Sequence, residues 1–132
     1  MFWHKEQSNI QSEVPESTKV HSHVWIGKDV KIGERCKIQA FVFIPTGVHI
    51  GDGVFIGPSV TFLNDKRPPS GNWVKTFVHN GASIGGGCTI LPGVTIGQDA
   101  MIGAGSVVTK DIPSGEVWLG NPAKFYKKKI NL

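Results

Sequence analysis

Aliphatic residues return at every sixth position along most of this chain. The first run is Val14, Val20, Ile26, Ile32, Ile38, Ile44, Ile50, Ile56 and Phe62, and the second is Val78, Ile84, Ile90, Ile96, Ile102 and Val108. Glycine often follows the aliphatic residue, and a small or β-branched residue stands four places after it. Neither the 3.6-residue period of a helix nor the two-residue period of a strand sustains this pattern, so it indicates an internal repeat.

A six-residue unit suits a short strand followed by a tight turn, in which glycine supplies positive φ angles. Three units close one triangular coil, and successive coils stack about 4.8 Å apart with their aliphatic residues inside. The two runs contain fifteen units. The pattern therefore predicts an all-β parallel helix of about five coils.

One polar passage interrupts the repeat. The step from Phe62 to Val78 is 16 positions, which is ten more than the regular six. The extra residues predict a loop at one corner that leaves the register of the coils intact, and long loops in compact domains usually serve function. We expect an N-terminal extension at 1–13, a repeat domain at 14–113 with the loop insertion at about 66–77, and a C-terminal segment at 114–132.

The repeat resembles the hexapeptide-repeat acyltransferases, which form left-handed parallel β-helices. Within that superfamily, "IGPSVTFLNDKRPP" and the segment that ends in "GAGSVVTKDIP" and "GNPAK" are most similar to N-acetyltransferases that act on nucleotide-linked amino sugars. The resemblance covers residues 14 to about 126. It implies direct attack of the sugar amine on acetyl-CoA, which is a co-substrate and not a permanently bound cofactor.

The resemblance also implies a homotrimer with active sites between subunits. The repeat places four aromatic residues on outward positions, namely Trp25, Phe41, Phe43 and Phe55. So much exposed apolar surface is unusual for a monomer, which agrees with that expectation.

The donor site is expected after the loop. By resemblance, Gly86 and Ala104, one coil apart, would lie along the pantetheine arm, and Thr109, Lys110 and Lys127 would face the adenosine and 3′-phosphate. A lysine suits phosphate as a point charge. The alternative is that the small residues serve the turns and the lysines are solvated.

The acceptor site is expected where the loop begins. Asn64 stands where related enzymes place an asparagine beside the acceptor amine and the CoA sulfur, and Asp65 would contact the sugar or receive the amine's proton. The alternative is that both residues only start the turn before Pro68. Thr46 stands where related enzymes often carry an acidic residue; if that acid binds the acceptor, this protein uses another group or takes a different sugar.

The loop itself offers further candidates. Lys66 and Arg67 suit the diphosphate of a nucleotide sugar, for which a guanidinium fork is well matched. Trp73 would stack on a base or cap a neighbouring subunit. The sequence leaves these two uses of Trp73 open.

Two other functions remain open. His79 would be the base of an O-acetyltransferase, because a hydroxyl acceptor needs one. A non-catalytic β-helix scaffold is the second alternative, and acetyl-CoA binding would separate it from an enzyme.

Composition and charge argue against nucleic-acid, membrane and metal binding. The net charge is +4, and four lysines lie in the terminal "KFYKKKINL", without an aromatic-interleaved motif for nucleic acid. The sequence has no long apolar run, which favours a cytoplasmic protein that does not bind membranes. The histidines do not form the spaced trio of a zinc enzyme, so no metal site is expected. Cys36 and Cys88 fall in small inward positions and should pack as free thiols.

Overall fold

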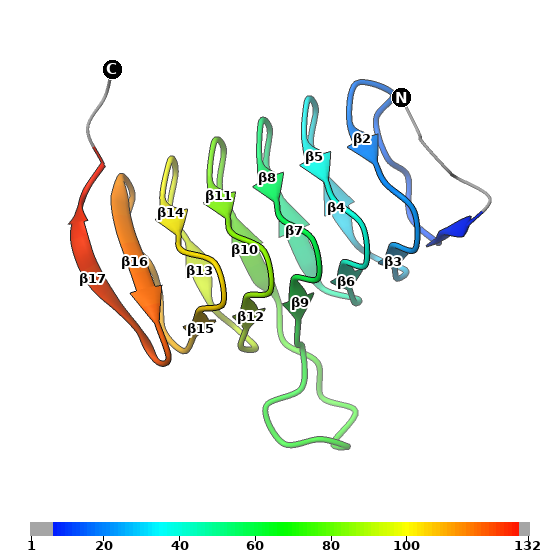
Figure 1. Ribbon diagram of the computed structural model, residues 1–132. Helices are drawn as coiled ribbons and strands as arrows, with labels where there is room; N and C mark the ends of the chain where they lie inside the picture. Colours follow the sequence, from blue (N-terminus) through cyan, green and yellow to red (C-terminus); the bar gives the residue numbers. More distant parts are fainter. Residues whose placement is uncertain (1–6, 130–132) are drawn as a thin grey trace.

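The computed structural model describes residues 7–129 as a prism of stacked coils with three sheets, whose strands are parallel except for the last pair, β16 and β17 (Figure 1). Sheet A contains β2 (Lys19–Val20), β5 (Lys37–Ile38), β8 (Phe55–Ile56), β11 (Ser83–Ile84), β14 (Met101–Ile102), β16 (Glu116–Gly120) and β17 (Ala123–Lys128). Sheet B contains β1 (Asn9–Ile10), β3 (Trp25–Ile26), β6 (Phe43–Ile44), β9 (Thr61–Phe62), β12 (Thr89–Ile90) and β15 (Val107–Val108). Sheet C contains β4 (Lys31–Ile32), β7 (Val48–Ile50), β10 (Thr76–Val78) and β13 (Thr95–Ile96).

The register of the sheets follows the repeat. Lys19 pairs with Lys37, which is one coil of 18 residues further along. Across the loop the same step becomes 28, because Phe55 pairs with Ser83. The ten extra residues therefore lie outside the sheets, and the coils continue in step on both sides of them.

The interior is a stack of aliphatic side chains. Ile26, Ile44 and Ile56 are completely buried, and the small residues four places after each aliphatic are buried too. Cys36 and Cys88 fill two of these positions, and their thiols point at the carbonyls of Gly51 and Gly103. Burial raises the pKa of both thiols, as expected for packed, unreactive cysteines. The predicted fold class, an all-β left-handed parallel β-helix, is confirmed.

The two ends of the helix differ from the repeat. Sheet B has six strands, so the helix makes about six turns instead of five. The additional strand β1 pairs Asn9 with Trp25, an offset of 16 that counting by six does not detect. At the other end, β16 and β17 form an antiparallel hairpin whose Trp118 joins the buried core. No helix in residues 7–129 is long and apolar enough to cross a membrane.

The glycines after the aliphatic residues do not serve the purpose that the sequence suggested. The positive φ angle falls two residues later in each turn, as at Gly53 with φ 65° and at the non-glycine residue Asp29 with φ 54°. The first glycine is required because the next coil approaches it closely. A Cβ on Gly85 would lie 2.6 Å from the backbone nitrogen of Ala104, where no side chain fits.

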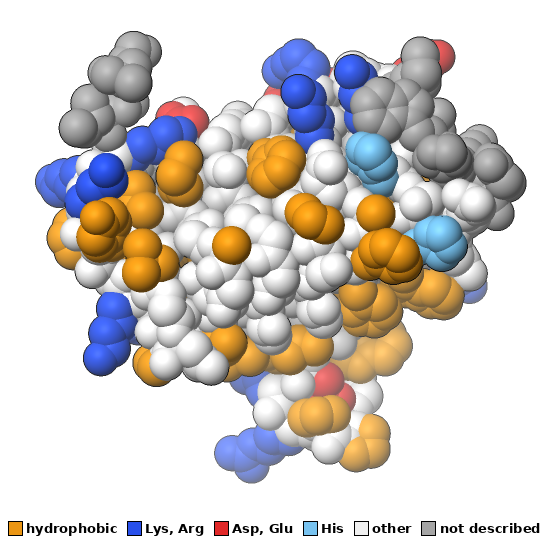
Figure 2. All heavy atoms as spheres, in the orientation of Figure 1, with side chains coloured by type: hydrophobic (Ala, Val, Ile, Leu, Met, Phe, Trp, Pro, Cys, Tyr) orange, Lys and Arg blue, Asp and Glu red, His pale blue; other side chains and the backbone are white. Residues whose placement is uncertain are grey.

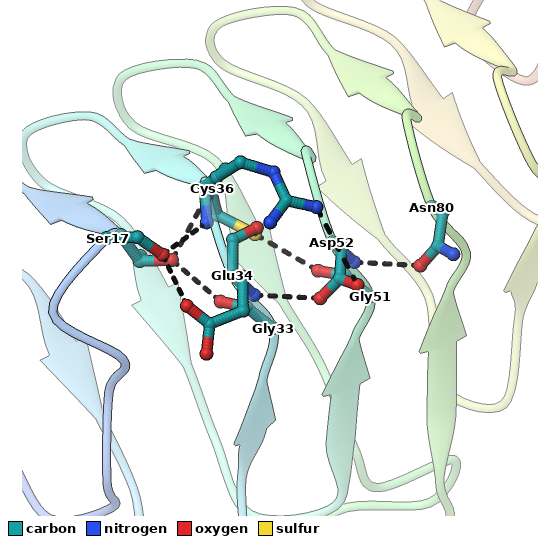
Figure 3. Close-up of polar contacts among 9 residues, drawn as sticks. Ser17, Gly33, Glu34, Cys36, Gly51, Asp52 and Asn80 are labelled. Carbon is teal, nitrogen blue, oxygen red and sulfur yellow. Dashed lines mark hydrogen bonds and ion pairs between the residues drawn. The ribbon is translucent and has the colours of Figure 1, made fainter.

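A polar ladder runs along the corner between sheets C and A, which we call the ladder corner (Figure 3). The backbone N–H of Glu34 donates to Oδ1 of Asp52 at 2.8 Å, and the N–H of Asp52 donates to Oδ1 of Asn80 at 2.8 Å. The N–H of Arg35 donates to Oγ of Ser17 at 2.8 Å. The side chain of one coil thus satisfies the backbone of its neighbour, and the ladder is structural.

Candidate functional site

The loop leaves the helix at the corner between sheets B and C, which we call the loop corner. Lys28, Thr46 and Asn64 occupy equivalent turn positions there, 18 residues apart. The chain departs after Asn64 and projects away from the prism below β9 (Figure 1). Each of these three residues therefore lies one coil further along the helix axis than the one before it.

The loop has a defined neck. The N–H of Val74 donates to the carbonyl of Asn64 at 2.9 Å, and Asp65 forms an antiparallel bridge with Trp73. Beyond the neck, Asp65 holds the tip. Its carboxylate accepts hydrogen bonds from the N–H groups of Arg67 at 3.0 Å and Ser70 at 2.8 Å, and from the Ser70 hydroxyl at 2.6 Å.

These contacts change the assignment of Asp65. The Ser70 hydroxyl, followed by the loop's backbone N–H groups, lowers the pKa of the Asp65 carboxyl below its ordinary value. A carboxylate with a lowered pKa is a weaker base, so it is poorly suited to receive a proton from the amine. Its geometry supports a role in shaping the loop.

Asn64 is anchored in one orientation. Its Nδ2 donates to the backbone carbonyl of Thr46, one coil away, at 2.9 Å. Within residues 7–129, Oδ1 of Asn64 accepts no hydrogen bond, and no buried side-chain oxygen lacks a partner. Oδ1 is therefore accessible and able to accept a hydrogen bond from a ligand.

A cavity of about 400 Å³ opens beside Asn64. Its lining combines aromatic and polar side chains with turn backbone: Gln11, Trp25, Gly27, Lys28, Phe43, Pro45, Thr46, Asn64 and Trp73. Trp25 and Phe43 are stacked with ring centroids 6.4 Å apart. Figure 2 shows hydrophobic side chains gathered over the N-terminal coils above the loop. A larger hollow of about 810 Å³ lies at the N-terminal end, away from every candidate site residue.

The other loop candidates point elsewhere. The space that a Cβ on Gly93 would occupy lies 3.2 Å from Cε of Lys66, so this lysine folds back toward the coil that follows the loop. Arg67 is exposed at the tip. Neither side chain lines the cavity, whereas Trp73 does.

Four of the five expected donor residues fall on two edges of sheet B, and Lys127 lies on β17 of sheet A. Gly86, which is half-buried, and Ala104, which is exposed, lie on adjacent coils at the corner between sheets A and B. Thr109 and Lys110 are exposed at the loop corner. Within one chain, the structure brings the two small residues together but separates them from Thr109 and Lys110 by the width of a sheet.

The two donor lysines lie near the C-terminal end. Nζ of Lys110 lies 5.7 Å from the ring centroid of Trp118, in the terminal hairpin. Nζ of Lys127 lies 5.7 Å from the ring centroid of Tyr126. Both ammonium groups are exposed at the end of the prism opposite the aromatic cavity.

His79 is not brought to Asn64 within one chain. It is exposed directly after β10, at the ladder corner, where its N–H donates to the carbonyl of Ile96 at 2.9 Å. A partnership of these two side chains would need a second subunit. Among residues 7–129, no group of three or more His, Cys, Asp or Glu side chains is placed to hold a metal ion.

Sequence reasoning did not place Lys28, Trp25 or Phe43 at the site, and it named the two aromatic residues only as outward positions. They lie 21 to 39 positions before the loop begins at Asn64, but Lys28 and Thr46 precede Asn64 by two coils and one coil. The 18-residue step is the signal that would find them. It places residues of one corner in a column, whatever their distance along the chain.

The family model "Bacterial transferase hexapeptide (six repeats)" matches residues 29–64 and 75–110, which is more than half of the chain. A serine acetyltransferase from Arabidopsis thaliana is 34% identical over 122 residues, covering 89% of this chain and 35% of the plant protein. A dTDP-3-amino-3,6-dideoxy-alpha-D-galactopyranose 3-N-acetyltransferase from Aneurinibacillus thermoaerophilus is 49% identical over 51 residues, which is 39% of this chain and 27% of that protein.

Among solved structures, a histidine-to-alanine variant of GDP-perosamine N-acetyltransferase from Caulobacter crescentus, in complex with CoA and GDP-perosamine, superposes with a TM-score of 0.76. It is 27% identical, and the match covers 92% of this chain and 51% of that one. The chain thus spans between about a quarter and a half of the length of these three proteins.

Proposed function

Since this chain belongs to the bacterial hexapeptide-repeat transferase family, we propose that it is an acetyl-CoA-dependent N-acetyltransferase acting on a nucleotide-linked amino sugar. The observation that carries the proposal is the geometry of Asn64. Its Nδ2 is held by Thr46, and its accessible Oδ1 borders a cavity of about 400 Å³, which is large enough to admit a sugar ring. Two similar proteins are named as acetyltransferases of nucleotide-linked amino sugars, which supports the choice of acceptor.

The proposed reaction is direct aminolysis. The neutral sugar amine attacks the thioester carbonyl, a C–N bond forms, and the resulting tetrahedral intermediate expels CoA as the C–S bond breaks. The proton lost by the nitrogen leaves with the thiol or passes to water. Oδ1 of Asn64 accepts one amine N–H and so directs the nitrogen lone pair at the carbonyl, which is a gain from orientation.

The donor assignments follow the same line. In this proposal Gly86 and Ala104, with no side chain and a single methyl group, lie along the pantetheine arm, while Thr109, Lys110 and Lys127 face the nucleotide end of CoA. A developing oxyanion is stabilised most effectively by fixed hydrogen-bond donors, and removal of one such donor costs about 2.7–4 kcal/mol in other enzymes. In this proposal Asp65 shapes the loop and does not act as a base.

The active form in this proposal is a homotrimer with its sites between subunits. Phe41 and Phe55, which do not line the cavity, are 61% and 37% exposed, so outward aromatic surface remains on the single chain for subunit contacts. A neighbouring subunit would also bring residues from different corners, such as Asn64 and Gly86, to one site. Light scattering should give three times the mass of 14.3 kDa, and a stable monomer at micromolar concentration would refute the trimer.

The test of the function is an acetyl-transfer assay. Purified protein is incubated with acetyl-CoA and amino sugars linked to dTDP, UDP or GDP, beside serine and a galactoside as hydroxyl acceptors. We expect CoA release and N-acetylation with at least one amino sugar. Transfer only to a hydroxyl acceptor would refute the N-acetyltransferase, and absence of acetyl-CoA binding in a thermal-shift assay would favour the scaffold.

A further inference from the structure

The loop corner has a direction along the helix axis. Asn64 lies at the middle of the corner, and the cavity beside it is built from coils that precede Asn64, together with Trp73. All of the expected donor residues, from Gly86 to Lys127, lie on coils that follow Asn64. Donor and acceptor therefore have different sides of Asn64 available to them.

The cavity suits a sugar ring. Its walls are the stacked rings of Trp25 and Phe43 together with Trp73, and aromatic rings pack well on the C–H face of a pyranose. Trp73 is 59% exposed, so it has surface to bury against a ligand. Polar groups are few, which is typical of small-molecule sites in which a small number of polar groups fix the orientation.

Lys28 closes the far side of this cavity. It lies two coils from Asn64, which is about 10 Å at a spacing of about 4.8 Å per coil. That separation is comparable to the span from the amine of a 3-aminohexose to the phosphates on its anomeric oxygen. Lys66, by contrast, folds toward Gly93 on the donor side and does not line the cavity.

We propose that the hexose of the acceptor sits between Trp73, Phe43 and Trp25, with its diphosphate on Lys28. This inference rests on the proposed function and gives it a direction: the acceptor extends from Asn64 toward the N-terminal coils, and acetyl-CoA toward the C-terminal coils. In this inference the diphosphate binds Lys28, and not Lys66 and Arg67 of the loop, which the sequence analysis favoured.

The test measures binding by calorimetry without acetyl-CoA. The ligands are the amino sugar linked to dTDP, UDP or GDP that binds the wild type most tightly, and the matching nucleoside diphosphate alone. Lys28→Gln should weaken both ligands about tenfold, because a hydrogen bond to a charged group contributes strongly. Trp73→Ala should weaken the nucleotide sugar about tenfold and leave the nucleoside diphosphate nearly unchanged.

Two variants serve as controls. Lys37→Gln removes an exposed lysine of sheet A and should change neither affinity. Lys66→Gln should also change neither. If Lys66→Gln weakens the ligands and Lys28→Gln does not, the inference is wrong while the proposed function stands.

Other outcomes also separate the two proposals. Equal weakening of both ligands by Trp73→Ala would place the base in the cavity and overturn the sugar subsite. If Lys28→Gln dissociates an oligomer, Lys28 lies in a subunit contact, and the proposed diphosphate contact is overturned as well. If the wild type neither binds nor acetylates any of these amino sugars, the proposed function itself fails.

Discussion

The ladder corner and the loop corner are built from the same six-residue turn, but their polar groups have different partners. At the ladder corner, Asp52 and Asn80 each accept a backbone N–H from the preceding coil. At the loop corner, Asn64 donates its N–H to the backbone and leaves its oxygen accessible. In these three turns, the accepting side chains of Asp52 and Asn80 satisfy the backbone of a neighbouring coil, whereas the donating Asn64 keeps an accessible oxygen.

The two asparagines allow a matched test of this difference, with the largest expected effect. Asn64→Ala should lower kcat/KM roughly 10²-fold, because the amine loses the group that orients it. Asn80→Ala should leave kcat/KM within about twofold and lower the free energy of unfolding by about 0.5–1.5 kcal/mol. Steady-state kinetics measure kcat/KM, and urea unfolding measures the free energy of unfolding. A fully folded but inactive Asn80→Ala would contradict the assignment of Asn80 to a purely structural role.

The close approach of coils at the ladder corner should be costly to disturb. A Cβ on Gly97 would contact the backbone nitrogen of Ser114, so Gly97→Ala should destabilise the fold by about 1–3 kcal/mol. Gly53 has φ 65° and open space around its Cβ position, so Gly53→Asn should cost about 1 kcal/mol or less, from backbone strain alone. Equal losses of stability for the two variants in urea unfolding would contradict the explanation that the close approach of the next coil requires the glycine after each buried aliphatic residue.

The shape of the loop should matter for acceptor binding and not for the fold. Asp65→Ala removes the hydrogen bonds that hold the tip, so KM for the amino sugar should rise about tenfold with Tm nearly unchanged. Because the Ser70 hydroxyl and the loop's N–H groups lower the pKa of the Asp65 carboxyl below its ordinary value, these bonds persist at neutral pH and are lost only as pH falls through the lowered pKa. A loss of acceptor affinity between pH 7 and 5 in the wild type would need another titrating group.

The donor side should respond to charge at the end of the prism. Lys110→Glu or Lys127→Glu should weaken acetyl-CoA about three- to tenfold and dephospho-CoA less, because only acetyl-CoA carries the 3′-phosphate. Calorimetry with both ligands measures the difference. Equal loss for the two would show that these lysines do not contact that phosphate.

The smallest effect is expected at His79. A sugar amine needs no strong base, so His79→Ala should reduce kcat/KM by less than about threefold. The similar Caulobacter structure is of a histidine-to-alanine variant, which makes this variant worth direct comparison with Asn64→Ala. An essential His79 with a dispensable Asn64 would indicate a hydroxyl acceptor instead.

The repeat was readable in the sequence because it concerns the core. Ile26, Ile44 and Phe62 recur in step, and burial of one aliphatic per unit leaves little freedom in where each strand lies. Strand β1 was missed because its offset from β3 is 16, and the terminal hairpin because it leaves the parallel order. These elements depend on how a stack of coils ends, which a periodic pattern does not encode.

The site was less predictable than the fold. Asn64 and Trp73 were identified from the loop, but Lys28 and Trp25 enter the cavity only through stacking of distant turns. The sequence predicts a contact between Asp65 and the acceptor, because a carboxylate at the start of a loop suits both ligand binding and turn formation. Its hydrogen bonds to Ser70 and Arg67 depend on the folded path of the loop, which local sequence does not determine.

The narrow neck of the loop has a consequence for how such a protein can change over time. Because Asn64 and Val74 are joined by a backbone hydrogen bond, the segment between them begins and ends at nearly the same point. Insertions or deletions at its tip leave the coil on either side in step, as the 28-residue offset from Phe55 to Ser83 shows. The loop can therefore change in length and composition while the stacked coils on either side keep their register.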